Sequence, residues 1–501
     1  MDRRSFIVSA AGAAVSAAQP ALARPGWLLA QRLDAAVARA MALGLAPGLS
    51  LAVYSPDGVY ARGFGLADAK AGLAATADTA FYAAASTKAM TALALAVTEE
   101  RGLLDLEATL AAYAPDAAFP AEARSDQVRL KDLLTHTSGI ENDPIGFRLA
   151  YSGEQDPAIL WRLLASSHAN RKAPLGTFRY TNTGYNIATI LTDRRLGVRW
   201  QDLLWRDLFA PLGLTRTSAF MSRAQKAGWS IARPHAVGAD GRFERAYLEK
   251  TDRTMHSAGG VVMSARDAAL WLELIVEGGR AGGRRIVPAS AVRRTCAAQV
   301  AVGETFGEYS RDRYAMGWYV GGYRGEPMLH DFGSFAGARA HVSFLPERRI
   351  GVAAFVNDAT VAFPLVDAVA SYVYDASAGR EDADARYEAA LAALQRRRQA
   401  ILAQMASRKG RPWLLSRPKE AYAGAYEHPE LGRMAVAVRG QVIEARIGLL
   451  HAVGEPFTAK DAVRFEFSPG DGDVVSFDGD GVRPASLIYA GKTFARVEAG
   501  G

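Results

Sequence analysis

The chain has 501 residues, half of them hydrophobic and 22% charged, and its formal net charge is +7. This is the composition of a globular chain long enough to bury a large core and to hold more than one domain. The basic residues are scattered and are not interleaved with aromatic side chains, so we expect no nucleic-acid partner.

Metal and disulfide chemistry have little support in the sequence. The single cysteine, Cys296, excludes an intramolecular disulfide and a cysteine-based zinc site. None of the eight histidines lies in a His-Glu-x-x-His pattern. We therefore expect neither a catalytic metal nor any other cofactor.

Residues 1–23 have the pattern of an export signal. Arg3-Arg4-Ser5-Phe6-Ile7-Val8 is similar to a twin-arginine signal, and a short apolar run then leads to Ala21-Leu22-Ala23, which is typical of a cleavage site. The apolar run is shorter than the roughly 20 residues that span a membrane, and no later segment approaches that length. We expect cleavage after Ala23, a periplasmic or secreted protein and no membrane span.

The next segments predict an antiparallel sheet flanked by helices. Apolar residues repeat at helical spacing from Leu28 to Leu43, and Pro47-Gly48 ends that pattern. Residues 49–54 and 59–64 are two strand-like runs joined by Ser55-Pro56-Asp57-Gly58, which indicates a hairpin.

A helix with Lys88 in its first turn follows this hairpin. Its apolar residues recur at helical spacing up to Gly102, and position 85 lies one turn before Lys88 on the same face. In one group of serine hydrolases a lysine so placed takes the proton from a serine hydroxyl, but residue 85 is alanine here. Ser86 lies about 200° round the helix from Lys88 and points away from it. Taken alone, the stretch also fits an amphipathic helix with a snorkelling lysine.

Two later segments carry further candidate site residues. In Tyr180-Thr181-Asn182, alternate residues of an extended segment project the same way, and a helix follows from about Gly184. A phenol whose pKa is lowered by a nearby lysine can act as an acid or base, and an amide can orient a substrate carbonyl. A core tyrosine beside a turn asparagine is the alternative. The Thr135-His136-Thr137-Ser138-Gly139 turn indicates a helix C-cap, with His136 as a buried, hydrogen-bonded support for the site.

A third region runs from Met328 to Gly337 and contains His330, Asp331 and Gly333. It leads into two predicted strands, residues 339–345 and 350–356. Polar groups on a strand beside the Lys88 helix are where donors to a substrate oxyanion or carboxylate would lie. Before this region, Ala258-Gly259-Gly260 precedes a predicted helix over residues 265–276.

The last part of the chain changes character. Residues 383–407 predict one long surface helix that acts as a linker. Short strand-like runs punctuated by glycine follow and predict a small separate barrel or sandwich. These runs are residues 433–439, 441–447, 462–467, 474–477, 485–489 and 493–497.

Together these segments resemble the β-lactamase-related serine hydrolases, a group with class C β-lactamases, DD-peptidases, D-aminopeptidases and family VIII esterases. The resemblance implies an α+β fold with an antiparallel sheet flanked by helices, an all-helical subdomain and a small C-terminal β-barrel. It divides the chain into residues 1–23 (export signal), 24–378 (hydrolase domain), 379–414 (helical linker) and 415–501 (barrel). It also implies that Lys88 is the general base, that Tyr180 carries a proton to the leaving group and that Asn182 contacts a small-molecule or peptide substrate.

Two positions depart from the pattern of the group. Ala85 occupies the position of the nucleophilic serine, and Asp331 aligns with a basic residue, with His330 one position earlier and Gly333 two positions later. If Asp331 faces the site, a carboxylate replaces a cation and disfavours anionic β-lactams and peptide C-termini. If a local bulge brings His330 into the site instead, the pocket is closer to the esterase and peptidase branch.

Three functional hypotheses remain. The first is a serine hydrolase acting on an amide, peptide or ester bond through an acyl-enzyme, here without its nucleophile and therefore inactive or substrate-trapping. The second is a natural pseudoenzyme that serves as a periplasmic ligand-binding or regulatory protein. The third makes the C-terminal β domain the working part, as an adhesion or assembly module.

Overall fold

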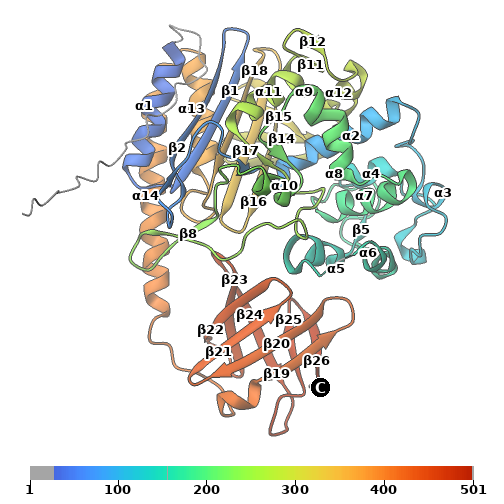
Figure 1. The fold of residues 1–501 in the computed structure, drawn as a ribbon, viewed down its shortest axis with the longest axis vertical. Helices are drawn as coiled ribbons and strands as arrows, with labels where there is room; N and C mark the ends of the chain where they lie inside the picture. The colour runs from blue at the N-terminus through green and yellow to red at the C-terminus, as the bar shows by residue number, and fades with distance from the viewer. Residues whose placement is uncertain (1–27, 155, 499–501) are drawn as a thin grey trace, which may run out of the picture.

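The structure is a computed structural model that describes residues 28–154 and 156–498. The predicted export signal and its cleavage site lie outside these residues. Figure 1 shows an α+β domain built on a large sheet, a long helix that descends along one side of it, and a β-barrel below. The predicted fold class is confirmed.

The central sheet has nine strands, and each hydrogen-bonded pair of neighbours is antiparallel. The predicted hairpin of residues 49–64 is confirmed, as are the two strands predicted after Gly337. Every residue of β1, β17 and β18 is buried, because helices cover both faces of the sheet. In spatial order the strands are β13 (Val300–Phe306), β14 (Tyr309–Tyr314), β15 (Tyr319–Tyr323), β16 (Glu326–Phe335), β17 (Ala338–Leu345), β18 (Ile350–Val356), β1 (Gly48–Ser55), β2 (Gly58–Asp68) and β3 (Leu73–Ala74).

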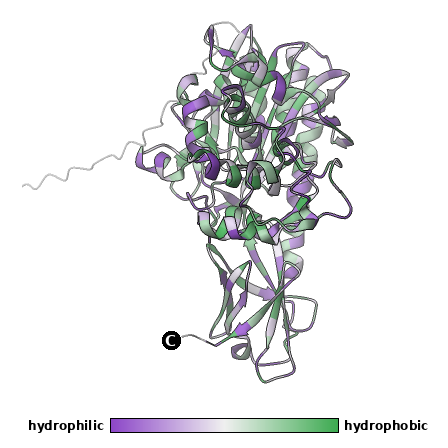
Figure 2. Cartoon of the chain, turned by 90° about the vertical axis from the view of Figure 1, so that its right-hand side faces the viewer, coloured by the Kyte–Doolittle hydropathy of each residue, from purple (hydrophilic) through white to green (hydrophobic). Residues whose placement is uncertain are grey.

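Two layers of helices enclose the sheet. On one face lie α1 (Leu28–Ala42) and α13 (Leu365–Ser377), and on the other lie α2 (Thr87–Glu100), α11 (Ala265–Val276) and α12 (Ala289–Cys296). In Figure 2 the interior of this domain is coloured mainly as hydrophobic. Each layer has its own hydrophobic cluster, and α2, which carries Lys88, is buried from Thr87 to Thr98.

A helical subdomain packs against the other side of α2. Its hydrophobic cluster joins Leu95 of α2 to the short helices between residues 110 and 204. Gly184 allows close packing there, because a Cβ at this position would lie 2.2 Å from the carbonyl oxygen of Leu133. The helices are α3 (Leu110–Tyr113), α4 (Leu130–Leu134), α5 (Asp143–Phe147), α6 (Pro157–Leu163), α7 (Thr183–Leu196) and α8 (Trp200–Leu204).

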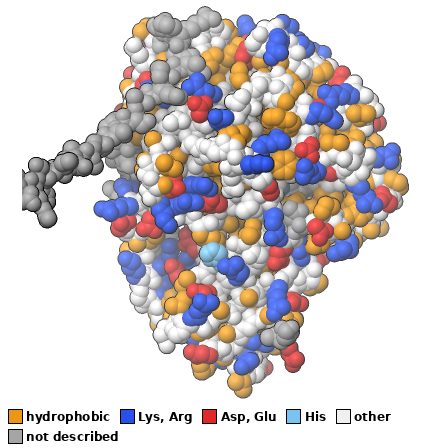
Figure 3. All heavy atoms as spheres, in the orientation of Figure 1, with side chains coloured by type: hydrophobic (Ala, Val, Ile, Leu, Met, Phe, Trp, Pro, Cys, Tyr) orange, Lys and Arg blue, Asp and Glu red, His pale blue; other side chains and the backbone are white. Residues whose placement is uncertain are grey.

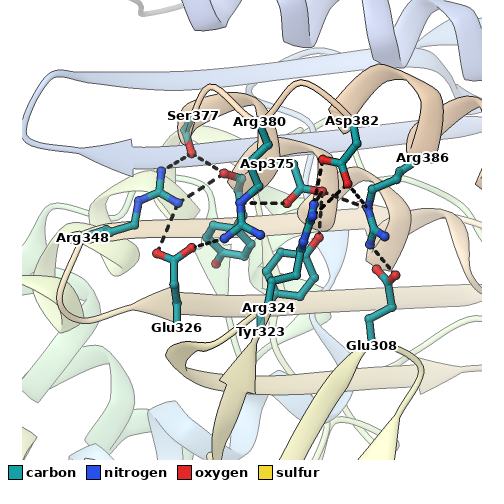
Figure 4. Close-up of polar contacts among 11 residues, drawn as sticks. Glu308, Tyr323, Arg324, Glu326, Arg348, Asp375, Ser377, Arg380, Asp382 and Arg386 are labelled. Carbon is teal, nitrogen blue, oxygen red and sulfur yellow. Dashed lines mark hydrogen bonds and ion pairs between the residues drawn. The ribbon is translucent and has the colours of Figure 1, made fainter.

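The long predicted helix is α14 (Ala383–Arg408), and its first half packs on α13. An ion-pair network fixes the corner between α13 and α14 to the sheet (Figure 4). At its centre, the buried carboxylate of Asp375 accepts hydrogen bonds from Tyr323 (3.0 Å), Arg324 (3.1 Å) and Arg386 (3.3 Å). The helix that leads to the barrel is therefore anchored to the first domain.

The C-terminal strands form a closed eight-stranded barrel, whose core continues into a cluster that includes Tyr82, Ala84 and Phe335 of the first domain. The sequence missed β19 and β22. β19 is only five residues long, and β22 buries a single residue, so neither has a clear strand pattern. The strands are β19 (Gly424–His428), β20 (Gly432–Arg439), β21 (Val442–Ile447), β22 (Leu450–Pro456), β23 (Ala462–Ser468), β24 (Asp471–Asp478), β25 (Ser486–Tyr489) and β26 (Lys492–Val497).

Positive and negative side chains are interspersed on the face drawn in Figure 3. Within the described part of the chain, no helix combines the length and apolarity needed to cross a membrane.

Candidate active site

The site is organised around the ammonium group of Lys88. A 3₁₀ turn, Ala84–Ser86, follows the short strand β4 (Phe81–Tyr82) and leads directly into α2. This places Lys88 in the first turn of a fully buried helix, where its side chain has no exposed surface. An ammonium group in such a place is costly unless all three of its donors are satisfied.

All three donors of Lys88 find acceptors. Its Nζ donates to the hydroxyl of Tyr180 (2.8 Å), to Oδ1 of Asn182 (2.8 Å) and to the carbonyl oxygen of Ala258 (2.9 Å). The structure thus brings together three sequence segments that lie far apart in the chain. Tyr180 is 37% exposed, so its ring forms the open side of the lysine pocket.

His136 supports this arrangement from behind. It is buried, and its ring nitrogens contact the hydroxyl of Tyr314 (3.2 Å) and the backbone amide of Thr181 (3.4 Å). Burial, and secondarily the charge of Lys88, hold the pKa of His136 well below 6.5. The imidazole is therefore neutral at physiological pH and acts as a fixed spacer beside Tyr180.

Ala85 lies in the turn just before Lys88 and is partly exposed. It is the one residue from Thr79 to Thr98 that is not buried. Its backbone amide donates to no group in the described part of the chain. Ala84 has φ 45°, in the left-handed region that costs a non-glycine residue roughly 1–2 kcal/mol. Strain of this kind is typical of functional sites.

Strand β16 presses against the same turn. A Cβ at Gly333 would lie 2.6 Å from the amide nitrogen of Ala85 and 2.7 Å from the carbonyl oxygen of Ala83, so only glycine fits. Ser86 is buried and its hydroxyl has no partner, while the donors of Lys88 are all directed elsewhere. Ser86 is therefore not paired with the lysine.

The structure decides between His330 and Asp331. Strand β16 pairs with β17 in an unbroken register from Leu329 to Phe335, so there is no bulge at this point. Because side chains alternate along a strand, Asp331 shares the face of Gly333 and acts electrostatically on Lys88. His330 lies on the other face, stacked on Phe332 with ring centroids 5.0 Å apart, and accepts a hydrogen bond from Arg311 (3.2 Å). The alternative in which His330 enters the site is wrong.

Burial and the Asp331 carboxylate set the protonation of the pocket. Burial lowers the pKa of Lys88 to about 8, although Asp331 opposes this shift. Burial raises the pKa of Asp331 to about 7, against the opposing effect of Lys88. Oδ1 of Asp331 accepts from the amide of Phe332 (2.8 Å), whereas Oδ2 is buried and has no partner.

The expectation that a lysine lowers the pKa of the phenol is wrong for Tyr180. Although part of its ring is exposed, the hydroxyl of Tyr180 lies against the buried Lys88; burial of this group, and then the charge of Asp331, raise the pKa of Tyr180 well above 10. An aspartate near the phenol disfavours the phenolate, so Tyr180 is neutral at physiological pH.

Sequence reasoning missed two polar residues behind the pocket, Asn186 and His256. Nδ1 of His256 contacts Oδ1 of Asn186 at 3.0 Å. The only sequence feature that could have pointed to Asn186 is its place one helical turn after Asn182, at the start of α7. Among the described residues, no group of three or more His, Cys, Asp or Glu side chains is placed to hold a metal ion.

The chain is similar to known hydrolases and penicillin-binding proteins. It is 24% identical over 474 residues to the unguisins hydrolase ungD of Aspergillus violaceofuscus, covering 87% of this chain and 81% of that protein. It is 25% identical to penicillin-binding protein 4 of Amycolatopsis lactamdurans, covering 62% of this chain and 81% of that protein.

Two solved structures share the fold. The octameric penicillin-binding protein homologue from Pyrococcus abyssi superposes with a TM-score of 0.58 at 21% identity, covering 93% of this chain and 99% of that chain. The D-amino acid amidase from Ochrobactrum anthropi SV3, complexed with L-phenylalanine, gives a TM-score of 0.53 at 21% identity, covering 66% and 90%. Residues 33–372, more than half of the chain, match the family model described as Beta-lactamase. The chain therefore belongs to the β-lactamase family.

Proposed function

We propose that this protein binds amide, peptide or ester substrates in the Lys88 pocket as a serine hydrolase of this family does, but does not form an acyl-enzyme. One observation carries the proposal. Lys88 keeps its hydrogen bonds to Tyr180 and Asn182, while residue 85, one turn before it, presents a methyl group instead of a hydroxyl. The lysine, phenol and amide are in contact, and the group that would attack the substrate is missing.

The remaining groups suit a bound carbonyl compound. The unpartnered amide of Ala85 is a donor for a substrate carbonyl oxygen at the open side of the pocket. Asn182 holds one side of the lysine and Tyr180 closes the other as a neutral phenol. With a serine at position 85, Lys88 would take its proton and Tyr180 would pass a proton to the leaving group; with alanine, the bound substrate stays intact.

Asp331 restricts the class of ligand. Its free carboxylate oxygen is buried on the face of β16 that also carries Gly333. A carboxylate there repels an anionic β-lactam or a peptide C-terminus, and it favours a neutral or cationic group. The name of one structural neighbour, a D-amino acid amidase, is in keeping with an amide ligand.

The second candidate function is that of a natural pseudoenzyme, a ligand-binding or regulatory protein in the periplasm. Asp331 favours it, because a carboxylate at this place departs from the hydrolase pattern in addition to Ala85. The twin-arginine-like start of the sequence supports export, and the proposed location is periplasmic or secreted.

The deciding experiment restores the nucleophile with Ala85→Ser. The variant and the unaltered chain are assayed with p-nitrophenyl esters, nitrocefin and D-amino-acid amides. Removal of a catalytic serine costs about 10⁶-fold in kcat in a serine protease, so the unaltered chain should be close to inert. Turnover that appears with the serine and disappears again in Ala85→Ser/Lys88→Ala supports the first candidate.

A covalent probe separates the two candidates. If Ala85→Ser is folded, as judged by circular dichroism, but reacts with neither a fluorophosphonate nor a penicillin, the hydrolase machinery is not retained. That result contradicts the first candidate and favours the pseudoenzyme.

A further inference from the structure

Two arginine side chains are buried on the face of the sheet that α1 and α13 cover, opposite the Lys88 pocket. Arg311 is 9% exposed and Arg339 is 4% exposed. Their guanidinium carbons lie 4.8 Å and 5.0 Å from the centroid of the same ring, that of Phe332. An arginine keeps its charge in a protein, so the fold holds two positive charges close together in its interior.

The buried carboxylates near these charges do not balance them. Oδ2 of Asp367 accepts a hydrogen bond from Nη2 of Arg339 at 3.4 Å. Burial raises the pKa of Asp331 to about 7, so this carboxyl is partly protonated at neutral pH, and Lys88 acts on it more strongly than either arginine does. Among the described buried groups of this region, Arg311, Arg339 and Lys88 thus face two carboxylates, and positive charge is in excess.

Several N–H donors of the two guanidinium groups are free. The rings of Phe306 and Phe332 lie over the flat faces of these groups, whereas the N–H bonds point outward in the plane. Arg311 uses only Nε, which donates to His330 at 3.2 Å. In the part of the chain that the structure describes, its Nη1 and Nη2 have no acceptor, and they are not fully enclosed by protein. Nε of Arg339 is buried without a partner.

The carboxylate that comes closest along the sheet does not fill this place. Glu304 lies directly opposite Arg311 in the β13–β14 pair. Its side chain is exposed, and across residues 28–154 and 156–498 no ion pair joins it to a cation. A guanidinium group that has lost most of its water and has no carboxylate partner is costly, so Arg311 calls for an anion from outside the chain.

We propose that Arg311 and Arg339 form a binding site for a small oxyanion, a carboxylate or a phosphate group. Nη1 and Nη2 of Arg311 donate to two of its oxygens in the parallel geometry that a guanidinium group offers, and Arg339 adds the second positive charge. The bound anion neutralises the excess charge, and the low dielectric of the interior strengthens the pairing.

This site is separate from the Lys88 pocket. It lies on the opposite face of the sheet and uses neither residue 85 nor Lys88. The proposal therefore goes beyond the function proposed above and does not rest on it.

The test is isothermal titration calorimetry of the unaltered chain at pH 7 with sodium acetate and with sodium phosphate, at an ionic strength held constant by sodium chloride. We expect one of the two oxyanions to bind at one equivalent per chain despite the chloride, because two oxygens match the paired N–H groups of Arg311 better than one chloride ion does. Tighter binding of acetate identifies a carboxylate site, and tighter binding of phosphate identifies a phosphate site. If neither binds, the proposal is overturned.

Variants locate the binding. Arg311→Gln should weaken it at least 10-fold, whereas the matched control Arg313→Gln, at an exposed position two residues later in β14, should change it less than threefold. Equal losses in the two variants would show a general attraction to positive charge and would refute the site. Loss of binding in Lys88→Gln would place the anion in the Lys88 pocket and would also refute it.

A second variant covers the case in which Arg311→Gln does not fold, as judged by circular dichroism. Arg311→Lys keeps the charge but loses the planar pair of donors, so it should bind the oxyanion at least threefold more weakly than the unaltered chain. Unchanged affinity in Arg311→Lys would overturn the proposed geometry.

Discussion

Replacing Asp331 by asparagine tests the electrostatics of the Lys88 pocket directly. The substitution keeps the shape of the side chain and an oxygen that can accept from the amide of Phe332, and it removes only the ionisable group. The carboxyl of Asp331 has a pKa of about 7 in the folded chain, against an ordinary value of 3.8. The folded state therefore holds a proton that the unfolded state has lost between these two pH values.

The sign and size of the effect follow from this difference. Between pH 3.8 and pH 7 the unfolded state binds fewer protons, so the unaltered chain loses stability as the pH rises, and the loss is complete above pH 7. At 1.36 kcal/mol per pKa unit, the loss is about 4 kcal/mol. Asp331→Asn has no such loss, so its free energy of unfolding relative to the unaltered chain should rise by about 4 kcal/mol between pH 4 and pH 7.

Urea denaturation, followed by tryptophan fluorescence at pH 4, 5, 6, 7 and 8, measures this difference. Asp126→Asn, at an exposed position, is the control and should run parallel to the unaltered chain. If the stabilities of Asp331→Asn and the unaltered chain also stay parallel across this range, Asp331 is not a buried acid and the description of the pocket is wrong.

Three further predictions concern the turnover and the framework of the site. In Ala85→Ser, the hydrolysis rate should rise with pH with a midpoint near 8, because Lys88 must be neutral to act as a base. Adding Asp331→Asn should move the midpoint of this pH–rate profile to lower pH, since the carboxylate raises the pKa of Lys88. Gly333→Ala should lower the free energy of unfolding by about 1–3 kcal/mol, measured in urea, because its Cβ would meet the amide of residue 85; an unchanged midpoint would show that the turn can move. Asp375→Asn should cost about 2 kcal/mol, less than the full penalty of a broken buried pair because its arginine partners are partly exposed. Asp382→Asn, at an exposed position, should cost clearly less; equal effects in thermal melts would argue against the network.

Much of the fold follows from local patterns in the chain. The hairpin of residues 49–64, the helix at residues 265–276 and the long helix after residue 383 have clear periodicity and clear end signals, and all three are confirmed. Strands β19 and β22 were not predicted, because in the barrel few of their side chains are buried and the alternation that marks a strand is weak.

The site is a different matter. Candidate site residues could be identified from their spacing, residues 85 and 88 in one segment and residues 180 and 182 in another. Such local spacing does not predict that the two segments contact each other in the folded chain. The direction of the Tyr180 pKa shift could not be predicted, because it depends first on the burial of the phenol in the folded chain and then on Asp331, a carboxylate from a distant strand.

The sequence by itself determined that position 85 has no nucleophile, that Lys88 lies one turn later on the same face, and that a sheet, flanking helices and a β-rich tail follow one another. These depend on residue identity and short-range periodicity, which a chain carries in any conformation. Only the tertiary structure decided that Asp331 rather than His330 faces the lysine, since that choice depends on the register of β16 against β17. The pKa values of Lys88 and Asp331 depend on how deeply each group is buried and on the distance between them, and only the folded chain fixes both.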